Sequence, residues 1–339
     1  MKTLLSTAPG GPDTLNLAEL PDPVPGPGEV LVKVAACAVN FPDTLIIRDL
    51  YQTRPPRPFA PGSEISGTIA ALGEGVEGWQ VGDRVIALTI WGGMQEKVVV
   101  PLHYLFGLPD GLPMNQACTL LMTYATMIHG LKDRGRLQAG ETLLVLGAAG
   151  GVGMAAVELG KAMGARVVAA VSSPKKADAV RRAGADAVVI YERGPLDKDQ
   201  SKALAQRFKQ ACGPDGADVV CDIIGGDYSE PALRAIAWQG RFLVLGFTAG
   251  IARLPLNLTL LKGCDVAGVF WGEFVRRHPD ENRAHVAELV RLWQEGRIDP
   301  VISATYPLER AAQAIAALEN RQAIGKLVVT MDAGCAGNA

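Results

Sequence analysis

Two groups of residues have types and spacing that could do chemistry: a glycine cluster at 147–153 and a set of hydroxyl and ammonium side chains further along the chain. The cluster follows a short apolar, β-forming run, Leu143–Leu146, and precedes an Ala-rich segment at 154–163 that predicts a helix. Such a turn lets a phosphate approach the free N–H groups of a helix start. Ala148, Gly150 and Gly153 give A-x-G-x-x-G, a dinucleotide-binding pattern whose first glycine is replaced by alanine. A purely structural glycine turn is the alternative.

The residues beyond the glycine cluster alternate between strand and helix patterns. Arg166–Val171 predicts a second strand, Lys175–Ala183 a helix that ends before Gly184, and Ala187–Tyr191 a third strand. Strand, helix, strand, helix and strand at this spacing form half of a doubly wound parallel sheet. We therefore expect a Rossmann α/β domain around the glycine cluster.

The end of the second predicted strand favours one dinucleotide over the other. An NAD-binding unit places Asp or Glu here to hold the ribose hydroxyls, whereas this chain has Ser172 and Ser173, followed by Lys175 and Lys176. A carboxylate repels a 2′-phosphate, while hydroxyls and an ammonium group attract it. Positive charge at a helix start opposes the macrodipole, which indicates a bound anion. We predict NADP(H); a solvated lysine pair is the alternative.

The whole chain has the composition of a globular protein. Its 339 residues are 48% hydrophobic, enough for two domains with their own cores, and the net charge is −2. This charge, without a basic and aromatic cluster, argues against a nucleic-acid partner. The six cysteines form no C-x-x-C pair, and no apolar run approaches the ~20 residues of a membrane span. Because the N-terminus also lacks a signal-peptide pattern, we expect a cytoplasmic protein with reduced thiols and no membrane partner.

Residues 1–118 have a different pattern from the rest of the chain. Strand-like segments there are separated by turns rich in Pro and Gly, which predicts a β-rich, barrel-like domain. Downstream, Ala217–Ile223 and Arg241–Leu245 predict two more buried strands, each followed by a Gly-rich loop. Loops at the carboxyl ends of parallel strands line the ligand crevice in an open α/β sheet. The predicted fold class is α/β with a second, β-rich domain.

Eight motifs, spread over nearly the whole chain, resemble those of one family. They are Pro25–Val30, Val39–Asp43, Pro61–Gly67, Val81–Val85, Ala148–Gly153, Val219–Gly226, Leu245–Phe247 and Gly325–Val329. The chain resembles the zinc-independent NADPH:quinone oxidoreductase (zeta-crystallin-like) branch of the medium-chain dehydrogenases/reductases. The resemblance implies a GroES-like, β-rich catalytic domain (residues 1–118 and 293–339) and a Rossmann NADP(H)-binding domain (residues 119–292). It also implies a homodimer.

The resemblance bears on metal content. Zinc-dependent relatives have Gly-His-Glu where this chain has Gly62, Ser63 and Glu64, and serine is a poor zinc ligand. Cys37 lies near a ligand position of those relatives, but no histidine partners it, which favours a small buried residue. We therefore predict no metal. Without that Lewis acid, the favourable reaction is hydride delivery from NADPH to a quinone or an electron-poor C=C bond.

Three candidate catalytic residues, Asn40, Asp43 and Tyr51, lie near the nicotinamide according to the resemblance. Asn40 can donate a hydrogen bond to a carbonyl oxygen as negative charge grows on it. An ionised Asp43 would repel that charge, so its expected role is to orient a side chain or a water. Asn-x-x-Asp in a loop is also typical of turn chemistry. Tyr51 could stack, form a hydrogen bond or fill space.

The resemblance further implies a set of cofactor contacts, from the pyrophosphate and the 2′-phosphate to the nicotinamide. The matched positions are Thr123, Tyr124, Gly150, Gly151, Val152, Ser172, Lys176, Tyr191, Phe247, Thr248, Phe270 and Trp271, with Arg321 and Lys326 near the end of the chain. Charges on a terminal helix and strand are usually solvated, which leaves the last two positions open.

Two other functions fit the same residues. The first is reduction of a 2-enoyl-CoA or acryloyl-CoA thioester, in which Arg54 and Arg57 would meet the CoA phosphates. Their sequence, Arg-Pro-Pro-Arg-Pro, is also typical of a stiff surface loop. The second is a non-enzymatic, crystallin-like protein that binds NADPH without turning it over. Turnover of NADPH with a small quinone separates an enzyme from such a binding protein.

Overall fold

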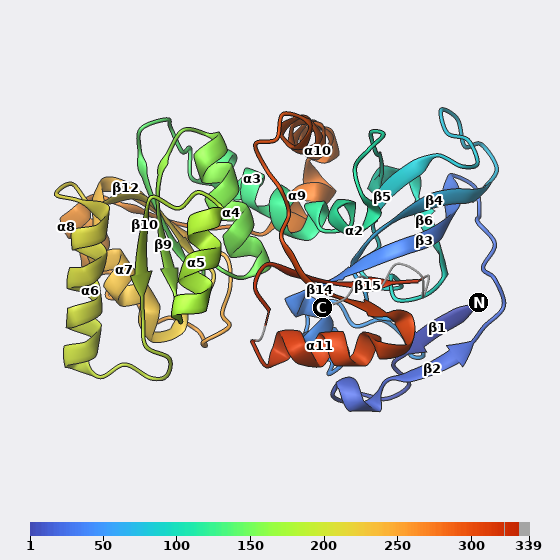
Figure 1. Cartoon of the computed structure of the whole chain (residues 1–339), viewed down its shortest axis with the longest axis horizontal. Helices are drawn as coiled ribbons and strands as arrows, with labels where there is room; N and C mark the ends of the chain where they lie inside the picture. The colour runs from blue at the N-terminus through green and yellow to red at the C-terminus, as the bar shows by residue number, and fades with distance from the viewer. Residues whose placement is uncertain (322, 332–339) are drawn as a thin grey trace. The chain divides into compact units, whose positions relative to one another are not determined.

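The computed structural model describes residues 1–321 and 323–331, and the chain forms two compact units (Figure 1). Unit 1 contains Met1–Met122 together with the chain from Pro300 onward, and unit 2 contains Thr123–Asp299. The chain thus passes between the units after residues 122 and 299. The sequence places these boundaries after residues 118 and 292.

Unit 1 is built on a largely antiparallel sheet to which both ends of the chain contribute. The strand order is β14-β15-β3-β4-β5-β7, and β6 also pairs with β3. The strands are β3 (Glu29–Val39), β4 (Glu64–Leu72), β5 (Arg84–Leu88), β6 (Lys97–Pro101), β7 (Leu105–Gly107), β14 (Ile302–Pro307) and β15 (Lys326–Thr330), with β1 (Lys2–Leu5) and β2 (Asn16–Glu19) in a separate pair. Because β15 runs antiparallel beside β3, the end of the chain completes this sheet. This is the GroES-like, β-rich domain expected from the sequence.

Buried valines and short helices close the core of unit 1. Along β3, Val30, Val32 and Val34 are buried in the core and Lys33 is exposed, while the second half of the strand is buried on both faces from Ala36 to Val39. The helical elements are η1 (Pro12–Thr14), α1 (Phe41–Ile46), η2 (Leu102–Tyr104), α2 (Met114–Ala117), η6 (Leu308–Arg310) and α11 (Ala311–Glu319). Helix α1 follows the end of β3, and this junction carries two of the three candidate catalytic residues, Asn40 and Asp43.

Unit 2 is a doubly wound α/β domain. Its six strands are parallel and lie in the order β10-β9-β8-β11-β12-β13, so the chain winds from the middle to one edge and then to the other. The strands are β8 (Thr142–Leu146), β9 (Arg166–Val171), β10 (Ala187–Ile190), β11 (Ala217–Asp222), β12 (Ile236–Val244) and β13 (Asp265–Gly268). The predicted Rossmann sheet is confirmed.

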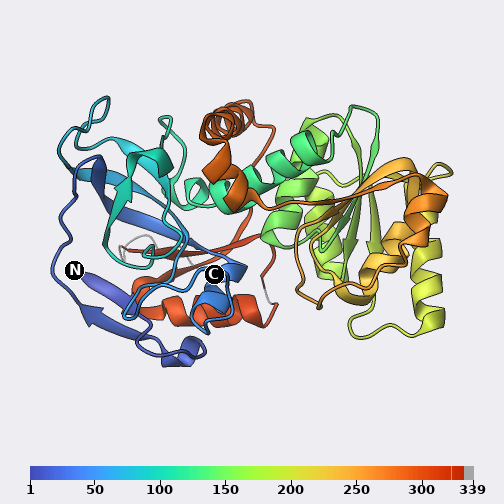
Figure 2. The same ribbon diagram turned by 180° about the vertical axis from the view of Figure 1, so that it is seen from behind.

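Helices cover both faces of this sheet, as Figures 1 and 2 show from opposite sides. Helix α4 packs on the face of Leu143, because a Cβ on Gly160 would stand 2.7 Å from the Leu143 Cδ2 atom. Leu144 points to the other face, into a core with Phe208 of α6. The helical elements are η3 (Leu120–Ala125, which begins in unit 1), α3 (Thr126–Ile128), η4 (His129–Arg134), α4 (Gly151–Ala162), α5 (Pro174–Arg182), α6 (Lys198–Cys212), η5 (Gly226–Tyr228), α7 (Ser229–Arg234), α8 (Asn257–Lys262), α9 (Trp271–Arg277) and α10 (Pro279–Gln294).

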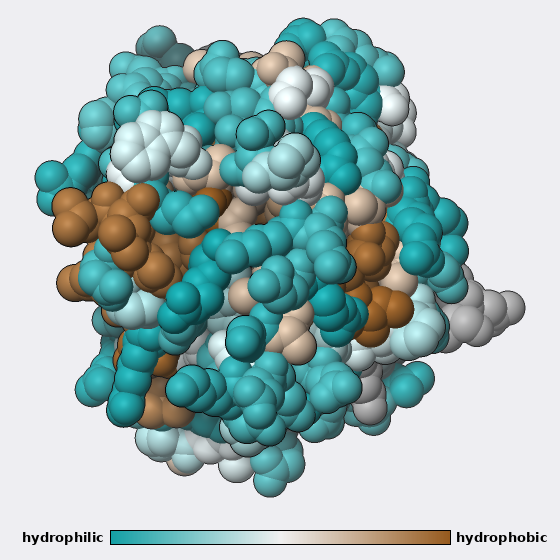
Figure 3. All heavy atoms as spheres, turned by 90° about the vertical axis from the view of Figure 1, so that its left-hand side faces the viewer, coloured by the Kyte–Doolittle hydropathy of each residue, from teal (hydrophilic) through white to brown (hydrophobic). Residues whose placement is uncertain are grey.

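The surface of unit 2 carries exposed apolar side chains around α8. Leu256, Leu260 and Leu261 are exposed, Leu260 by 81%, and Ile251 and Val266 lie exposed in the same part of the chain. Figure 3 looks onto this end of the unit and shows apolar side chains gathered at the surface. Within the described ranges, no helix combines the length and apolarity needed to cross a membrane.

Candidate active site

The junction between β3 and α1 holds two of the candidate catalytic residues. Asn40 is the N-cap of α1, and Asp43 lies in the first turn of that helix. Asp43 is 1% exposed, and its oxygens accept hydrogen bonds from the backbone N–H groups of Asn40 (2.7 Å) and Gly62 (3.1 Å). Burial raises the pKa of Asp43 to about 6, against the lowering effect of these two bonds. The motif therefore fixes a turn, and it also places a carboxyl group with a pKa near neutrality beside Asn40.

The carboxamide nitrogen of Asn40 already has protein acceptors. Its Nδ2 atom lies 2.9 Å from Glu64 Oε1 and 3.3 Å from both Ser63 Oγ and the Ala38 carbonyl oxygen. Asn40 is 6% exposed. Because these three acceptors outnumber the two amide hydrogens, a hydrogen bond from Asn40 to a substrate would replace one of them.

The carboxamide oxygen of Asn40 faces a buried lysine. The Nζ atom of Lys326, at the start of β15, lies 2.5 Å from Asn40 Oδ1 and 3.2 Å from both Glu64 Oε1 and the Val39 carbonyl oxygen. Lys326 is 4% exposed, so the interpretation as a solvated terminal charge is wrong for this residue. The physical reason is that β15 lies inside the sheet, beside β3, where its side chains meet the core.

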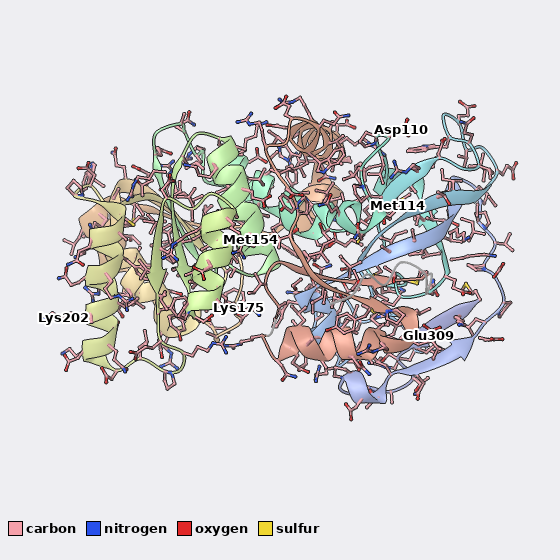
Figure 4. All side chains as sticks on the ribbon, in the orientation of Figure 1. Asp110, Met114, Met154, Lys175, Lys202 and Glu309 are labelled. Carbon is pink, nitrogen blue, oxygen red and sulfur yellow. The ribbon has the colours of Figure 1, made fainter. Side chains whose placement is uncertain are left out.

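In unit 2, the turn between β8 and α4 has the arrangement of a dinucleotide-binding site. Gly147 has φ = +70°, a conformation that favours glycine, and Gly150 is the N-cap of α4. A Cβ on Gly153 would stand 2.3 Å from the Gly147 carbonyl oxygen, so glycine is required where the helix packs on the turn. Gly150 is exposed, which leaves the start of α4 open to an anion. Met154, labelled in Figure 4, lies near the start of α4 and is buried.

The end of β9 gathers hydroxyl and cationic side chains. Ser173 caps α5, its Oγ accepting a hydrogen bond from the Lys176 backbone N–H at 3.4 Å. The Ser172 Oγ atom instead accepts from Arg193 Nε at 3.2 Å. Lys175, labelled in Figure 4, is exposed in the first turn of α5. Arg193 is absent from the predicted site because no motif covers its loop. The signal that could have indicated it is a positively charged residue two positions after Tyr191.

The loop that carries Arg193 is held in place by Tyr228. The Tyr228 hydroxyl accepts a hydrogen bond from the Gly194 N–H at 3.2 Å and lies 3.0 Å from the Glu192 carbonyl oxygen. Its ring contacts that of Tyr191, with centroids 4.9 Å apart. The backbone on both sides of Arg193 is thus anchored, while the Arg193 side chain is exposed.

Comparisons with known proteins agree with both units. Residues 26–110 match the family model described as an alcohol dehydrogenase GroES-like domain, and residues 151–291 match a zinc-binding dehydrogenase model. Quinone oxidoreductase-like protein 2 of Rattus norvegicus is 35% identical over 313 residues, which cover 92% of this chain and 87% of that protein. The chain belongs to the quinone oxidoreductase family of medium-chain dehydrogenases/reductases.

Solved structures similar to this quinone oxidoreductase family member have the same fold. A mycobacterial protein complexed with NADPH aligns with a TM-score of 0.89 at 30% identity, covering 97% of this chain and 100% of its own. Quinone oxidoreductase of Escherichia coli, also complexed with NADPH, aligns with a TM-score of 0.88 at 26% identity, with the same coverage.

The remaining cofactor positions matched to the quinone oxidoreductase family fall into two groups. Several follow parallel strands of unit 2 at their carboxyl ends, the edge where such sheets bind ligands. They are Gly150, Gly151 and Val152 after β8, Ser172 and Lys176 after β9, Tyr191 after β10, Phe247 and Thr248 after β12, and Phe270 and Trp271 after β13. Thr123 is buried at the start of unit 2, and Arg321 is exposed in unit 1 after α11.

Two aromatic residues of the predicted site have defined surroundings. Tyr51 packs, half-buried, against the core of unit 1. Burial and the nearby charge of Asp43 both raise the pKa of Tyr51. Trp271 is buried, and its Nε1 donates to Asn282 Oδ1 at 3.0 Å, so its side chain fixes the start of α9.

The residues near the metal position of the zinc-dependent relatives are a poor donor set. Cys37 is fully buried, and burial holds the pKa of its thiol well above its usual range, which disfavours the thiolate that binds zinc. The charged groups near this thiol are the carboxyl groups of Asp43 and Glu64 and the ammonium group of Lys326. Across the described part of the chain, no group of three or more His, Cys, Asp or Glu side chains could hold a metal ion. The zinc-binding family model covers residues 151–291, which lie in unit 2.

Unit 2 also contains a buried carboxyl group with a raised pKa. Glu158 of α4 is 6% exposed, and its Oε2 atom accepts hydrogen bonds from the Tyr124 hydroxyl (2.8 Å) and the Asp299 N–H (3.0 Å). Burial raises the pKa of Glu158 to about 7. Tyr124 and Asp299 stand at the two ends of the segment that forms unit 2, so one oxygen atom ties both ends to α4.

Proposed function

We propose that this protein is a cytoplasmic, NADPH-dependent reductase that transfers hydride to a quinone or an α,β-unsaturated carbonyl without a metal. The observation that carries the proposal is the group of hydroxyl and cationic side chains at the end of β9, where Arg193 reaches Ser172. An NAD-binding unit would have a carboxylate there. The NADPH complexes of two similar structures support the same cofactor.

The residues present fit NADPH, which supplies the hydride when bound. The backbone of Gly150, Gly151 and Val152, at the start of α4, would hold the pyrophosphate. Ser172, Lys176 and Arg193 would hold the 2′-phosphate, since charge-assisted hydrogen bonds to an oxyanion are stronger than neutral ones. Arg193 can offer its free guanidinium N–H groups while Nε remains on Ser172.

The acceptor end of the proposed reaction involves the β3–α1 junction. A quinone that receives a hydride must also gain one proton to become a hydroquinone. Asn40 would stabilise the negative oxygen by donating an amide hydrogen, in exchange for one of its present acceptors. A carboxyl with a pKa of about 6, as in Asp43, can hold or release a proton near neutral pH. Tyr51, whose hydroxyl group interacts with the charge of Asp43, is a further candidate to orient the acceptor.

The proposal that no metal takes part rests on the donor set. A divalent cation beside Cys37 and Ser63 would lie close to an ammonium group that already neutralises Glu64. It would also require the loss of a proton from a thiol whose pKa is well above its usual range. Hydride transfer to a quinone or an enone needs no Lewis acid of that strength.

A CoA thioester is the less favoured acceptor. Arg57, one of the two arginines that could meet CoA phosphates, is engaged within unit 1: Nη1 lies 2.7 Å from Asp49 Oδ1, and Nη2 donates to the Ile47 carbonyl oxygen at 3.0 Å. Its guanidinium also stands over the ring of Phe59, 5.3 Å from the centroid. Arg54 is exposed and remains available. One exposed arginine is weak support for a phosphate-rich substrate.

We also propose that the protein is a homodimer that associates through the α8 and β13 side of unit 2. β13 is the last strand of its sheet, and an edge strand offers backbone groups for pairing with a second copy. The apolar side chains of Leu256, Leu260 and Val266 lie exposed in this region. Leu260→Glu should yield monomers by sedimentation, whereas Val24→Glu, at an exposed valine of unit 1, should not. A monomeric wild-type protein would contradict this proposal.

A screen of acceptors tests the proposed activity. NADPH oxidation is followed with small quinones, enones and 2-enoyl-CoA thioesters, each corrected for the rate without protein. We expect turnover with quinones or enones that exceeds turnover with the thioesters. The reverse order would establish the CoA alternative, and tight NADPH binding without any turnover would establish the non-enzymatic one.

A further inference from the structure

The ammonium group of Lys326 is the positive centre of a buried polar cluster in unit 1. Three acceptors surround its three protons: Asn40 Oδ1, Glu64 Oε1 and the Val39 carbonyl oxygen, at 2.5, 3.2 and 3.2 Å. Burial of a charge is costly unless it is paired and its hydrogen bonds are satisfied, and both conditions hold here. The other oxygen of Glu64 accepts from the Met122 N–H at 2.8 Å. The cluster is therefore a satisfied network with one defined arrangement.

This network decides which way the Asn40 carboxamide points. A lysine ammonium only donates, so the atom of Asn40 that faces it must be the oxygen. The nitrogen is then directed at Glu64 and Ser63. A donor on the oxygen of an amide also polarises its N–H groups, which strengthens them as hydrogen-bond donors. The orientation and the donor strength of Asn40 thus depend on a residue that is far from it in the sequence.

We propose that Lys326 is a positioning residue of the reaction: its ammonium group orients the Asn40 carboxamide and, paired with Glu64, sets the electrostatic field at the Asp43 carboxyl group. This inference rests on the proposed function, because it assigns Asn40 and Asp43 to the acceptor site.

Lys326 and Glu64 act on Asp43 in opposite directions. Burial is the main reason that the pKa of Asp43 is raised to about 6; the charge of Lys326 lowers this pKa and the charge of Glu64 raises it. The other titratable groups coupled to Asp43 are the thiol of Cys37 and the hydroxyl of Tyr51, both neutral near pH 6. Removal of the lysine charge should therefore raise the pKa of Asp43, and removal of the glutamate charge should lower it.

The experiment compares pH profiles of kcat/KM for Lys326→Met, Lys326→Arg and Glu64→Gln with that of the wild type. Lys33→Met is the matched control, because Lys33 lies exposed on β3 of the same sheet. NADPH affinity is measured separately, by titration of cofactor fluorescence. We expect Lys326→Met to lower kcat roughly 10- to 100-fold and to leave NADPH affinity unchanged. The limb set by Asp43, on which kcat/KM falls as this carboxyl group loses its proton with rising pH, should move to higher pH by about half a unit or more. Glu64→Gln should move the same limb to lower pH, and Lys326→Arg should keep it near the wild-type position.

The double variant Lys326→Met/Glu64→Gln keeps the test valid if the single lysine variant does not fold. It removes both charges, so Glu64 is not left as a buried carboxylate without its lysine, and the pH limb of the double variant should return toward the wild-type position. The inference would be overturned if the pH limb did not move, or if it moved in the same direction in Lys326→Met and Glu64→Gln. The proposed function would still stand in that case. A wild type that does not turn NADPH over would overturn both.

Discussion

The side chain of Arg193 lies across the carboxyl ends of two neighbouring strands, with its Nε atom 3.2 Å from Ser172 Oγ. Ser172 follows β9 and Arg193 follows β10, so one contact links the two loops at which a dinucleotide's adenosine end is read. Tyr228 fixes the backbone on both sides of Arg193. Two cations of independent origin, Lys176 from α5 and Arg193 from the next loop, therefore belong to the proposed 2′-phosphate site.

Lys176→Ala should weaken NADPH binding by roughly 10- to 100-fold and leave the weaker NADH binding nearly unchanged. A charge-assisted hydrogen bond contributes about 1.5–3 kcal/mol, and 1.4 kcal/mol is tenfold in affinity. The measurement is the Kd of each cofactor for the wild type and the variant. Lys202→Ala is the control, since Lys202 is exposed on α6 (Figure 4). Equal loss of both cofactors would mean that Lys176 does not contact the 2′-phosphate.

Arg193→Ala should likewise reduce the preference for NADPH over NADH, by about tenfold, because it removes a guanidinium beside Ser172. The ratio of kcat/KM for the two cofactors is the quantity to measure. Arg182→Ala, at an exposed arginine of α5, provides the matched comparison. An unchanged ratio would show that Arg193 serves only to hold the Ser172 hydroxyl.

Asn40→Ala should lower kcat by about tenfold or more while KM changes less, because the amide would contact charge that grows in the transition state. We expect this fall in kcat to be smaller than that caused by removing a hydrogen-bond donor from a dedicated oxyanion hole, because a quinone is easily reduced. Steady-state kinetics with the best quinone or enone provide the measurement. A variant with wild-type kcat for every acceptor would identify Asn40 as a turn residue without a part in the reaction.

Glu158→Gln should make the free energy of unfolding less dependent on pH. The pKa of Glu158 is about 7 in the folded protein and has a reference value of 4.5, so the folded state holds this proton more tightly. Stability contributed by that proton is present below about pH 4.5 and is lost as the pH rises to about 7. The free energy of unfolding is measured with urea at pH 5 and at pH 8. It should fall between these pH values in the wild type, and this fall should be smaller in the variant by roughly 2–3 kcal/mol. Glu77→Gln, at an exposed glutamate, should reproduce the wild-type drop.

The sequence predicts the parts of the fold that have strong local signals. The glycine turn and the apolar strands of unit 2 can be read from motifs and patterning. The return of the chain end to the first domain is implied by the family resemblance. Helix α6 lies outside every motif, and the sequence interpretation contains no helix there. Its buried residues nevertheless have helical spacing, and a capping box marks its start; the buried residues are Leu204, Ala205, Phe208 and Cys212. The positions after parallel strands follow from the topology, since all strands of such a sheet end at one edge.

Sequence reasoning misses Arg193 and leaves the role of Lys326 open, because the contacts of both residues are made with elements that are distant in the sequence. Lys326 is charged and near the end of the chain, and its burial depends on β15 pairing beside β3. Arg193 lies in an irregular loop, and its relation to Ser172 depends on the parallel pairing of β9 and β10. Lys326 lies in the Gly325–Val329 motif, but neither residue has a local pattern that identifies its partners, so only the tertiary structure reveals its contacts.

The most direct test of the central claim is NADPH oxidation by metal-stripped protein in the presence of a small quinone. After exhaustive chelation, with zinc content checked by elemental analysis, kcat/KM is measured for NADPH and for NADH. The predicted result is full activity without stoichiometric zinc and a clear preference for NADPH. Activity that is lost on chelation and restored by zinc, or a preference for NADH, would contradict a metal-free, NADPH-dependent reductase.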